Sequence, residues 1–272
     1  MSPAGPRLAL VRQAVLDVRR EPDHRSELTN QLLLGEAVRI GAGRGPGGWV
    51  RLAGQADGYR GWARDWGLEP VHAAGLARWC SAARHRVAVP VTHLEPDAEA
   101  GGARGPLPWM SRVERVGSAR TGIAVVRLPD GRMGRVAAGA LRPLSARPPA
   151  LDERVRSLLG APYLWGGRTV LGIDCSGLTQ LVLAERGVAL PRDADPQWRA
   201  VRHLAPHEPL RPADLVFFAS TRRGRMEHVG VYLGRGRYLH ARAVVRINSL
   251  DPSNPLFDNE LAGQLIGFGR AG

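Results

Sequence analysis

The sequence contains no lysine, so every basic residue in this chain of 272 residues is an arginine. Cysteine is almost as scarce: Cys80 and Cys175 are too few for a disulfide framework, which favours a reducing compartment. No apolar stretch approaches the ~18 residues of a membrane span. The start of the chain has no apolar run longer than Leu8–Val11, so we expect no secretory signal peptide, no membrane partner and a cytoplasmic location.

The net charge of +13 raises the question of a nucleic-acid partner. The arginines are scattered along the chain rather than gathered in one block, and a GC-rich coding sequence gives the same preference for arginine. We therefore expect no nucleic-acid partner, while a general attraction for small anionic substrates remains compatible with the charge.

The pattern of short apolar runs divides the chain into three segments. Residues 8–70 alternate such runs with Gly, Pro and Asp turns, which is typical of a small antiparallel barrel. Residues 80–146 repeat this texture more weakly and indicate a second, diverged barrel, with residues 95–108 as a loop inside it. Pro143–Pro149 reads as a stiff linker, so we place the domain boundaries at 1–75, 76–147 and 148–272.

The third segment begins with helix-patterned residues and ends with strand-patterned ones, which predicts an α+β domain. In it, Cys175 follows an irregular glycine-rich stretch and precedes the helix-patterned run Leu178–Arg186. A thiol at a helix start meets unpaired N–H groups and the positive end of the helix dipole, and both favour the nucleophilic thiolate.

Two histidines accompany this cysteine on a predicted hairpin. A three-residue loop over Gly234–Gly236 would pair Leu233 with Arg237. In that register His228 and His240 share a face of the sheet, one diagonal step apart, with Cβ atoms within roughly 7 Å. A two-residue turn without a bulge would put the two histidines on opposite faces.

The three side chains together predict a cysteine hydrolase. His228 would accept the proton of Cys175 and later donate it to the departing amine, and His240 would fix the tautomer of His228. The backbone N–H of Cys175 and the hydroxyl of Tyr163 would stabilise the oxyanion. The sequence holds no metal-ligand spacing such as His-Glu-x-x-His or Cys-x-x-Cys, so we expect no metal and no other cofactor.

These features match a known family. The motifs that carry the match are, in order, Tyr163-Leu164-Trp165-Gly166-Gly167, Asp174-Cys175-Ser176-Gly177, Pro212–Phe218, His228–Leu233 and His240-Ala241. Over about residues 150–270 they resemble the NlpC/p60 papain-like cysteine peptidases. The resemblance implies a papain-like domain that cleaves peptidoglycan peptides, commonly at the γ-D-glutamyl–diamino acid bond, with the three residues above as its catalytic set.

The first segment resembles bacterial SH3 domains, through Arg19, Pro22, Ser26-Glu27-Leu28, Gln31, Gly35-Glu36, Gly48-Trp49 and Asp57–Trp62. The predicted architecture is therefore a papain-like NlpC/p60 domain preceded by two small all-β SH3-like barrels. This order resembles the cytoplasmic γ-D-glutamyl-L-diamino acid endopeptidases of the dipeptidyl-peptidase VI type, which recycle murein stem peptides bearing a free N-terminal L-alanine.

The resemblance also implies how that free amine is bound. Asp193 would pair with the α-ammonium group, with Glu27 and Tyr59 of the first barrel closing that end of the site. A desolvated ammonium needs a partnered carboxylate, and such a pair rejects acylated amines. Asp193 could instead cap the following helix, and Glu27 and Tyr59 could be ordinary barrel-surface residues. Ser176 could bind the D-glutamate α-carboxylate.

We therefore expect a monomeric peptidase acting on L-Ala-γ-D-Glu-diamino acid peptides; the sequence leaves open whether the diamino acid is meso-diaminopimelate, lysine or ornithine. Two alternatives remain. An exported hydrolase could act on intact peptidoglycan with the SH3 domains as wall anchors, or the chain could be a non-catalytic wall-binding protein. The absent signal segment speaks against the first, and the intact set of cysteine and two histidines against the second.

Overall fold

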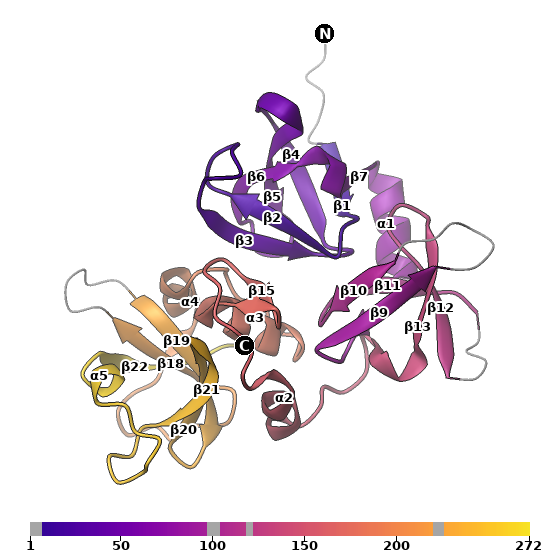
Figure 1. The fold of residues 1–272 in the computed structure, drawn as a ribbon. Coiled ribbons are helices and arrows are strands. Elements are labelled where there is room, and N and C mark those ends of the chain that lie inside the picture. The colour runs from indigo at the N-terminus through magenta and orange to yellow at the C-terminus, as the bar shows by residue number, and fades with distance from the viewer. Residues whose placement is uncertain (1–6, 97–103, 118–121, 220–225) are drawn as a thin grey trace. The chain divides into compact units, whose positions relative to one another are not determined.

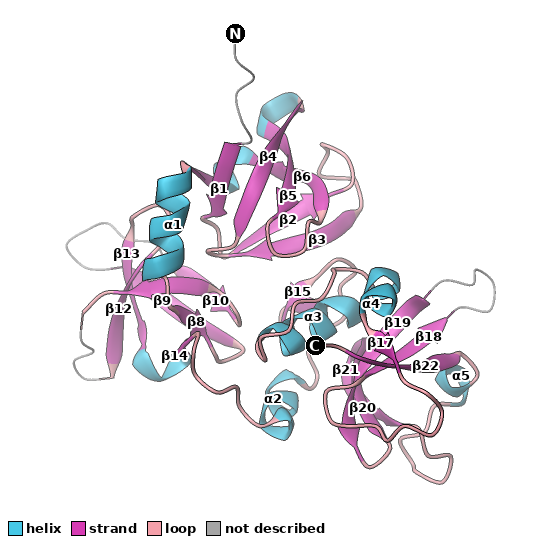
Figure 2. Cartoon of the chain, turned by 180° about the vertical axis from the view of Figure 1, so that it is seen from behind, coloured by secondary structure: helices cyan, strands magenta, loops and turns pink. Residues whose placement is uncertain are grey.

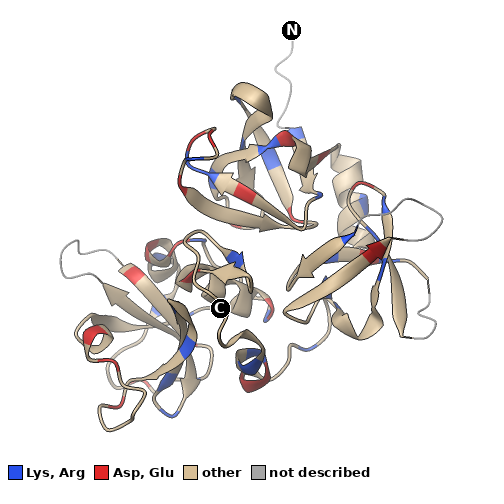
Figure 3. Cartoon of the chain, viewed as in Figure 1, with Lys and Arg blue, Asp and Glu red and all other residues tan. Residues whose placement is uncertain are grey.

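The computed structural model describes residues 7–96, 104–117, 122–219 and 226–272. The chain forms two compact units, Met1–Ala146 and Arg147–Gly272 (Figure 1). Helices, strands and connecting loops are distinguished in Figure 2. Arginines and acidic residues are interspersed over both units (Figure 3).

The N-terminal unit begins with a seven-stranded antiparallel barrel. Its strands alternate inward apolar and outward polar side chains; in β2, Leu16 and Val18 are buried while their neighbours are half-buried. The strand order is β3-β2-β6-β5-β4-β1-β7. The strands are β1 (Arg7–Val11), β2 (Val15–Arg19), β3 (Leu28–Leu33), β4 (Ala37–Arg44), β5 (Trp49–Gly54), β6 (Arg60–Arg64) and β7 (Leu68–Val71).

A second barrel repeats this topology. Its order, β10-β9-β13-β12-β11-β8-β14, becomes that of the first barrel when each strand number is lowered by seven. The predicted second SH3-like barrel is therefore present. Its strands are β8 (His85–Val87), β9 (Val91–Pro96), β10 (Gly105–Pro108), β11 (Arg112–Arg115), β12 (Ile123–Arg127), β13 (Met133–Ala137) and β14 (Leu141–Pro143).

Helix α1 (Ala73–Ala82) joins the two barrels, and the predicted boundary at residue 75 falls inside it. The Trp79 indole N–H donates to the Gly35 carbonyl at 3.0 Å, and the Arg112 guanidinium donates to the carbonyls of Ala83 and Cys80. The Arg112 amide also donates to the Leu34 carbonyl at 2.8 Å. The helix and the β3–β4 turn are thus anchored to the second barrel.

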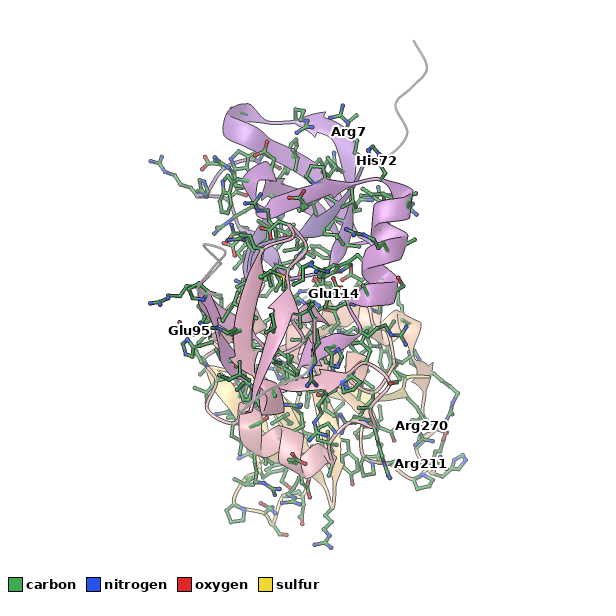
Figure 4. All side chains as sticks on the ribbon, turned by 90° about the vertical axis from the view of Figure 1, so that its right-hand side faces the viewer. Arg7, His72, Glu95, Glu114, Arg211 and Arg270 are labelled. Atoms are coloured by element: carbon green, nitrogen blue, oxygen red, sulfur yellow. The ribbon has the colours of Figure 1, made fainter. Side chains whose placement is uncertain are left out.

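Side-chain pairs across neighbouring strands stabilise both units. Glu114 on β11, labelled in Figure 4, lies opposite Arg127 on β12 and accepts a hydrogen bond from its guanidinium at 2.8 Å. Arg270, labelled in the same view, forms two hydrogen bonds of 2.7 Å with the buried carboxylate of Asp214. The second pair ties the last strand of the chain to the residue before β18.

The C-terminal unit packs helices against a six-stranded antiparallel sheet of order β17-β22-β18-β19-β20-β21, as the α+β prediction requires. Helix α3 packs on β19 and β20, and α4 on β19. The elements are α2 (Leu151–Leu158), β15 (Arg168–Thr169), β16 (Gly172–Ile173), α3 (Cys175–Ala184), α4 (Ala194–Ala200), β17 (Arg202–His203), β18 (Leu215–Ala219), β19 (Met226–Gly234), β20 (Arg237–Arg242), β21 (Val244–Ser249), α5 (Asn259–Ala262) and β22 (Leu265–Arg270).

Three elements depart from the sequence-based expectations. Helix α1 was not among the elements expected from the sequence, although Leu76, Trp79 and Ala83 recur at helical spacing and pack with Leu10. The expected loop over residues 95–108 contains β10, which pairs with β9; its residues 97–103 lie outside the described residues. Strand β21 extends the sheet past the predicted hairpin. No helix in the described part of the chain is long and apolar enough to span a membrane.

Gly35 of the first barrel lies close against Arg112 of the second barrel, so a substitution at Gly35 probes the contact between them. Its φ is +83°, and an added Cβ would lie 2.6 Å from the Arg112 carbonyl oxygen. Gly58 also has a positive φ, but nothing lies within 4 Å of its Cβ position. We expect Gly35→Ala to lower the free energy of unfolding of the N-terminal unit by about 2–5 kcal/mol and Gly58→Ala by about 1–2 kcal/mol. Urea unfolding followed by circular dichroism measures both, and equal losses would contradict this account.

Candidate active site

Cys175 is the first residue of α3, and its position is fixed by the residue before it. Asp174 is the N-cap, and its Oδ1 accepts a hydrogen bond from the Gly177 amide at 2.7 Å. Its Oδ2 accepts one from the Gly166 amide at 2.9 Å. One carboxylate therefore holds both the start of the helix and the glycine-rich segment that precedes it.

The Asp174 carboxylate is itself paired with Arg192. Their hydrogen bonds are 2.6 Å (Nη2 to Oδ2) and 2.9 Å (Nη1 to Oδ1), and the Arg192 side chain is 1% exposed. Buried charges of this kind are stable only when the geometry satisfies both partners. Arg192 thus allows a charged N-cap to lie beside the cysteine in the interior of the unit.

The Cys175 thiol lies against the main chain on either side of His228. Its Sγ is 3.9 Å from the Glu227 carbonyl oxygen, and it accepts a hydrogen bond from the Val229 N–H. Burial, followed by the charge of Asp174, raises the pKa of Cys175 to about 12, although the Val229 and Ser176 N–H groups act in the opposite direction. The helix start alone favours the thiolate, as expected, but burial outweighs it and the resting group is the thiol.

The hairpin that carries the histidines differs in detail from the predicted one. The turn has two residues, Arg235 and Gly236, both with positive φ, and Gly234 rather than Leu233 pairs with Arg237. A bulge between Tyr232 and Gly234 compensates for the shorter turn. The register beyond the bulge is the predicted one, so the histidines share a face.

The two imidazoles are in direct contact. His228 Nε2 lies 2.8 Å from His240 Nδ1, and the rings meet edge to face. Burial, with the neighbouring His240 as the second cause, lowers the pKa of His228 to about 3. Burial also lowers the pKa of His240 to about 4, although the hydrogen bond that His240 donates to Asn248 acts in the opposite direction. The charges of Arg242 and Arg246 lower the pKa of both histidines. Both rings are therefore neutral at pH 7, and His228 can accept a proton.

A fourth member of this group, Asn248, was not predicted from the sequence. Its Oδ1 lies 2.8 Å from His240 Nε2, and its Nδ2 donates to the Leu256 carbonyl at 2.8 Å. Asn248 lies on β21, opposite Tyr238 and diagonal to His240. The alternation of Val244–Ser249 could have extended the sheet by one strand, but nothing in the sequence marks this asparagine as a partner of His240.

Tyr163 lies beside the cysteine and the histidine pair. It lines a pocket of about 230 Å³ together with Glu227, His228, Arg242 and Gln264. Burial raises the pKa of the Tyr163 hydroxyl, with the nearby Cys175 as the second cause. The phenol therefore stays protonated and can donate a hydrogen bond to an oxyanion.

Ser176 and Asp193 flank the same region. The Ser176 hydroxyl accepts from Arg192 Nη1 at 2.9 Å and lies 3.3 Å from Asp174 Oδ1, so its proton is directed at Asp174. Binding a substrate carboxylate would require this bond to break. Asp193 occupies the N-cap position of α4, but its side chain does not cap the helix and is exposed to solvent. The capping role considered for Asp193 is therefore not the one observed.

Glu27 and Tyr59 belong to the N-terminal unit. Glu27 precedes β3 and forms an ion pair of 2.6 Å with Arg20, while Tyr59 precedes β6. Arg19 at the end of β2 pairs with both β3 and β6, so the two residues border the same edge of the barrel. Two strand spacings separate β3 from β6, a distance of about 10 Å.

Within the described residues, no group of three or more His, Cys, Asp or Glu side chains has the arrangement of a metal site. The region offers a thiol, two neutral imidazoles and an amide, with backbone N–H groups and a phenol as hydrogen-bond donors. Such a set can perform nucleophilic acyl transfer.

The Arg192–Asp174 pair has a matched counterpart in the same unit. Arg154 and Glu185 form an equally buried pair between α2 and the end of α3, with a shortest distance of 2.5 Å. We expect Arg192→Met and Arg154→Met each to cost about 3–5 kcal/mol, because each leaves a buried carboxylate without its partner. Only Arg192→Met should also lower the kcat of acyl transfer through Cys175 per folded molecule, measured at a temperature where both variants stay folded. An equal loss of kcat in both would refute the positioning role of Arg192.

The buried histidines also predict a pH-dependent stability. Below the ordinary value of 6.5 the unfolded chain binds protons at His228 and His240, whereas the folded chain does so only near 3 and 4. The free energy of unfolding should therefore fall as the pH drops from 6.5 towards 4, by up to about 1.4 kcal/mol per pH unit for each histidine. Urea unfolding at pH 7 and pH 5 measures this slope. His228→Gln should flatten it, exposed His207→Gln should not, and a wild-type slope of zero would contradict the prediction.

Two parts of the chain match known protein families. Residues 160–265 match the NlpC/P60 family, and residues 18–66 match the bacterial dipeptidyl-peptidase SH3 domain. The chain is 36% identical over 120 residues to a γ-D-glutamyl-L-lysine dipeptidyl-peptidase of Bacillus cereus, covering 42% of this chain and 36% of that protein. It is 33% identical over 159 residues to dipeptidyl-peptidase 6 of Lysinibacillus sphaericus, covering 53% of this chain and 55% of that protein.

These alignments span roughly one third to one half of the two relatives. An NlpC/P60 family protein from Bacillus cereus of known structure shares the fold over 97% of this chain and 99% of its own, with a TM-score of 0.81 and 23% identity. The predicted family resemblance and fold class are thereby confirmed. Residues 160–265 belong to the NlpC/P60 family, and residues 18–66 form a bacterial dipeptidyl-peptidase SH3 domain.

Proposed function

We propose that this protein hydrolyses the γ-D-glutamyl–diamino acid bond of murein stem peptides through a thioester on Cys175. The observation that carries the proposal is the thiol held at the start of α3, against the main chain flanking a neutral histidine pair. The names of the relatives, which include a γ-D-glutamyl-L-lysine dipeptidyl-peptidase, support the bond type.

The proposed reaction proceeds in two steps. His228 removes the proton of Cys175, the thiolate attacks the γ-carbonyl carbon, and the N–H of Cys175 and the Tyr163 hydroxyl donate to the oxyanion. His228 then gives its proton to the departing amine, and the C–N bond breaks to leave a thioester. Water, deprotonated by His228, attacks the thioester and returns the thiol. Burial makes the free thiolate unfavourable, so proton transfer accompanies attack.

The substrate requirement that we propose is a free N-terminal L-alanine. Asp193 would pair with the α-ammonium group, and Glu27 and Tyr59 would close that end of the site. The exposed Asp193 carboxylate and the position of Glu27 and Tyr59 at one edge of their barrel support this role. Ser176 would bind the D-glutamate α-carboxylate after its hydroxyl turns away from Asp174.

Location and oligomeric state complete the proposal: a cytoplasmic, monomeric enzyme that recycles peptides already released from the wall. An exported hydrolase with the same chemistry is the competing interpretation. The two differ in whether the amine of the first alanine must be free, since the peptides of intact peptidoglycan carry that amine in an amide bond.

Mass spectrometry of the purified protein with two peptides tests the proposal. We expect release of L-Ala-D-Glu from L-Ala-γ-D-Glu-meso-diaminopimelate, loss of that release in Cys175→Ala, and no cleavage of the N-acetylated peptide. Asp193→Asn should lower kcat/KM for the free peptide by about 100-fold or more, the cost of leaving a desolvated ammonium unpaired.

The other outcomes are equally informative. Equal cleavage of both peptides would refute the amine site and favour the exported hydrolase. Cleavage of neither, nor of the corresponding lysine and ornithine peptides, would refute the enzyme and favour a wall-binding protein. Parallel assays with lysine and ornithine peptides identify the preferred diamino acid.

A further inference from the structure

Asn248 is a buried polar residue beside the histidine pair that the reaction scheme above does not use. It is 8% exposed and ends a continuous line of hydrogen bonds from His228 through His240 to the Leu256 carbonyl. Each contact in this line is 2.8 Å long. The donors and acceptors along this line are fixed from one end, which gives the line a direction. The Leu256 carbonyl can only accept a hydrogen bond, whereas an imidazole nitrogen can either donate or accept.

The direction begins at Leu256. A backbone carbonyl can only accept, so the atom of Asn248 that faces it must be the Nδ2 amine. This fixes the orientation of the amide, with Nδ2 toward the Leu256 carbonyl and Oδ1 toward His240. The Leu256 carbonyl is itself held, because it also accepts from the Ser249 amide at 3.0 Å.

The amide orientation then determines the tautomer of His240. The Asn248 oxygen faces His240 Nε2 and can only accept, so Nε2 carries the proton. In a neutral ring the other nitrogen, Nδ1, then holds a lone pair. Nδ1 faces His228 Nε2 at 2.8 Å, so His228 must donate there, and its own proton is on Nε2.

The consequence for His228 is that Nδ1 remains its one basic atom. Nδ1 is bonded to the ring carbon nearest the main chain, and the thiol of Cys175 lies against the main chain of Glu227 and Val229 on either side of this histidine. In the reaction proposed above, this Nδ1 is therefore the atom of His228 that would accept the proton of Cys175.

We propose that Asn248 is a positioning residue for proton transfer: held by the Leu256 carbonyl, it sets the tautomer of His240 and, through it, that of His228. The inference rests on the proposed function for its catalytic consequence. The tautomers themselves are a property of the protein without substrate, and can be measured whether or not the peptides above are cleaved.

Nitrogen-15 NMR of imidazole-labelled protein at pH 7 reports the tautomers directly. In the wild type we expect the Nε2–H form at both His228 and His240. In Asn248→Leu, which keeps the side-chain size and removes the acceptor, we expect the Nδ1–H form to appear at both rings. With L-Ala-γ-D-Glu-meso-diaminopimelate as substrate, we expect Asn248→Leu to lower kcat about 10- to 100-fold with little change in KM. The upper limit of the loss is the ~10⁴-fold that follows when the histidine of a catalytic triad is held in the wrong tautomer.

Two further variants separate positioning from stability. Asn248→Asp keeps an acceptor toward His240, so we expect it to retain the Nε2–H forms, recover most of kcat and shift the acid limb of the pH profile upward, because its charge favours a protonated His240. Tyr232→Phe removes a hydrogen bond from the Gly236 amide in the same sheet without touching the line, and should change neither tautomers nor kcat.

The proposal is overturned by unchanged tautomers in Asn248→Leu, or by a kcat loss no larger than that of Tyr232→Phe. If Asn248→Leu does not fold, Asn248→Asp still decides. Retained Nε2–H forms with an upward shift of the acid limb support the proposal, and an unshifted limb contradicts it. A wild type that shows the predicted tautomers but cleaves neither peptide refutes the proposed function and leaves the assignment of Asn248 standing.

Discussion

The buried ion pair between Asp174 and Arg192 is the interaction on which the geometry of the site depends. The Asp174 carboxylate caps α3, binds the Gly166 amide of the preceding segment and accepts two hydrogen bonds from Arg192, which also reaches the Ser176 hydroxyl. An uncompensated carboxylate in this position would be expelled to water, and the start of the helix with it. The Arg192 guanidinium therefore allows a charged Asp174 to support the Cys175 thiol rigidly from the neighbouring position in the chain.

The second constraint is desolvation, which acts in the same direction on all the reacting groups. Burial raises the pKa of Cys175 and lowers the pKa of both His228 and His240, so the resting site holds a thiol and neutral imidazoles instead of an ion pair. A site of this kind avoids a buried charge separation until substrate is bound. Orientation of the neutral rings then matters more than charge, which is why hydrogen-bond direction along β19, β20 and β21 is significant.

The two barrels of the N-terminal unit have the same strand order, although the second has a weaker sequence pattern than the first. The domain match covers residues 18–66 of the first barrel, yet the second barrel repeats the strand order of the first in full. What the two share is alternation of buried and exposed positions, not particular residues. Helix α1 and the contact of Gly35 with Trp79 and Arg112 make the pair one compact unit.

The α+β class, the barrels and the grouping of Cys175, His228 and His240 could be predicted from the sequence, because strand alternation and helix-start chemistry are local and leave a periodic signal. Tertiary structure decided the rest. The bulge near Tyr232 restores the strand register that a two-residue turn would otherwise shift, so that the two histidines share a face. Burial keeps Cys175 as a thiol, although its place at a helix start favours the thiolate. The contacts of Asn248 and Arg192 join residues from separate elements, and contacts between residues distant in sequence leave no periodic trace in a single chain.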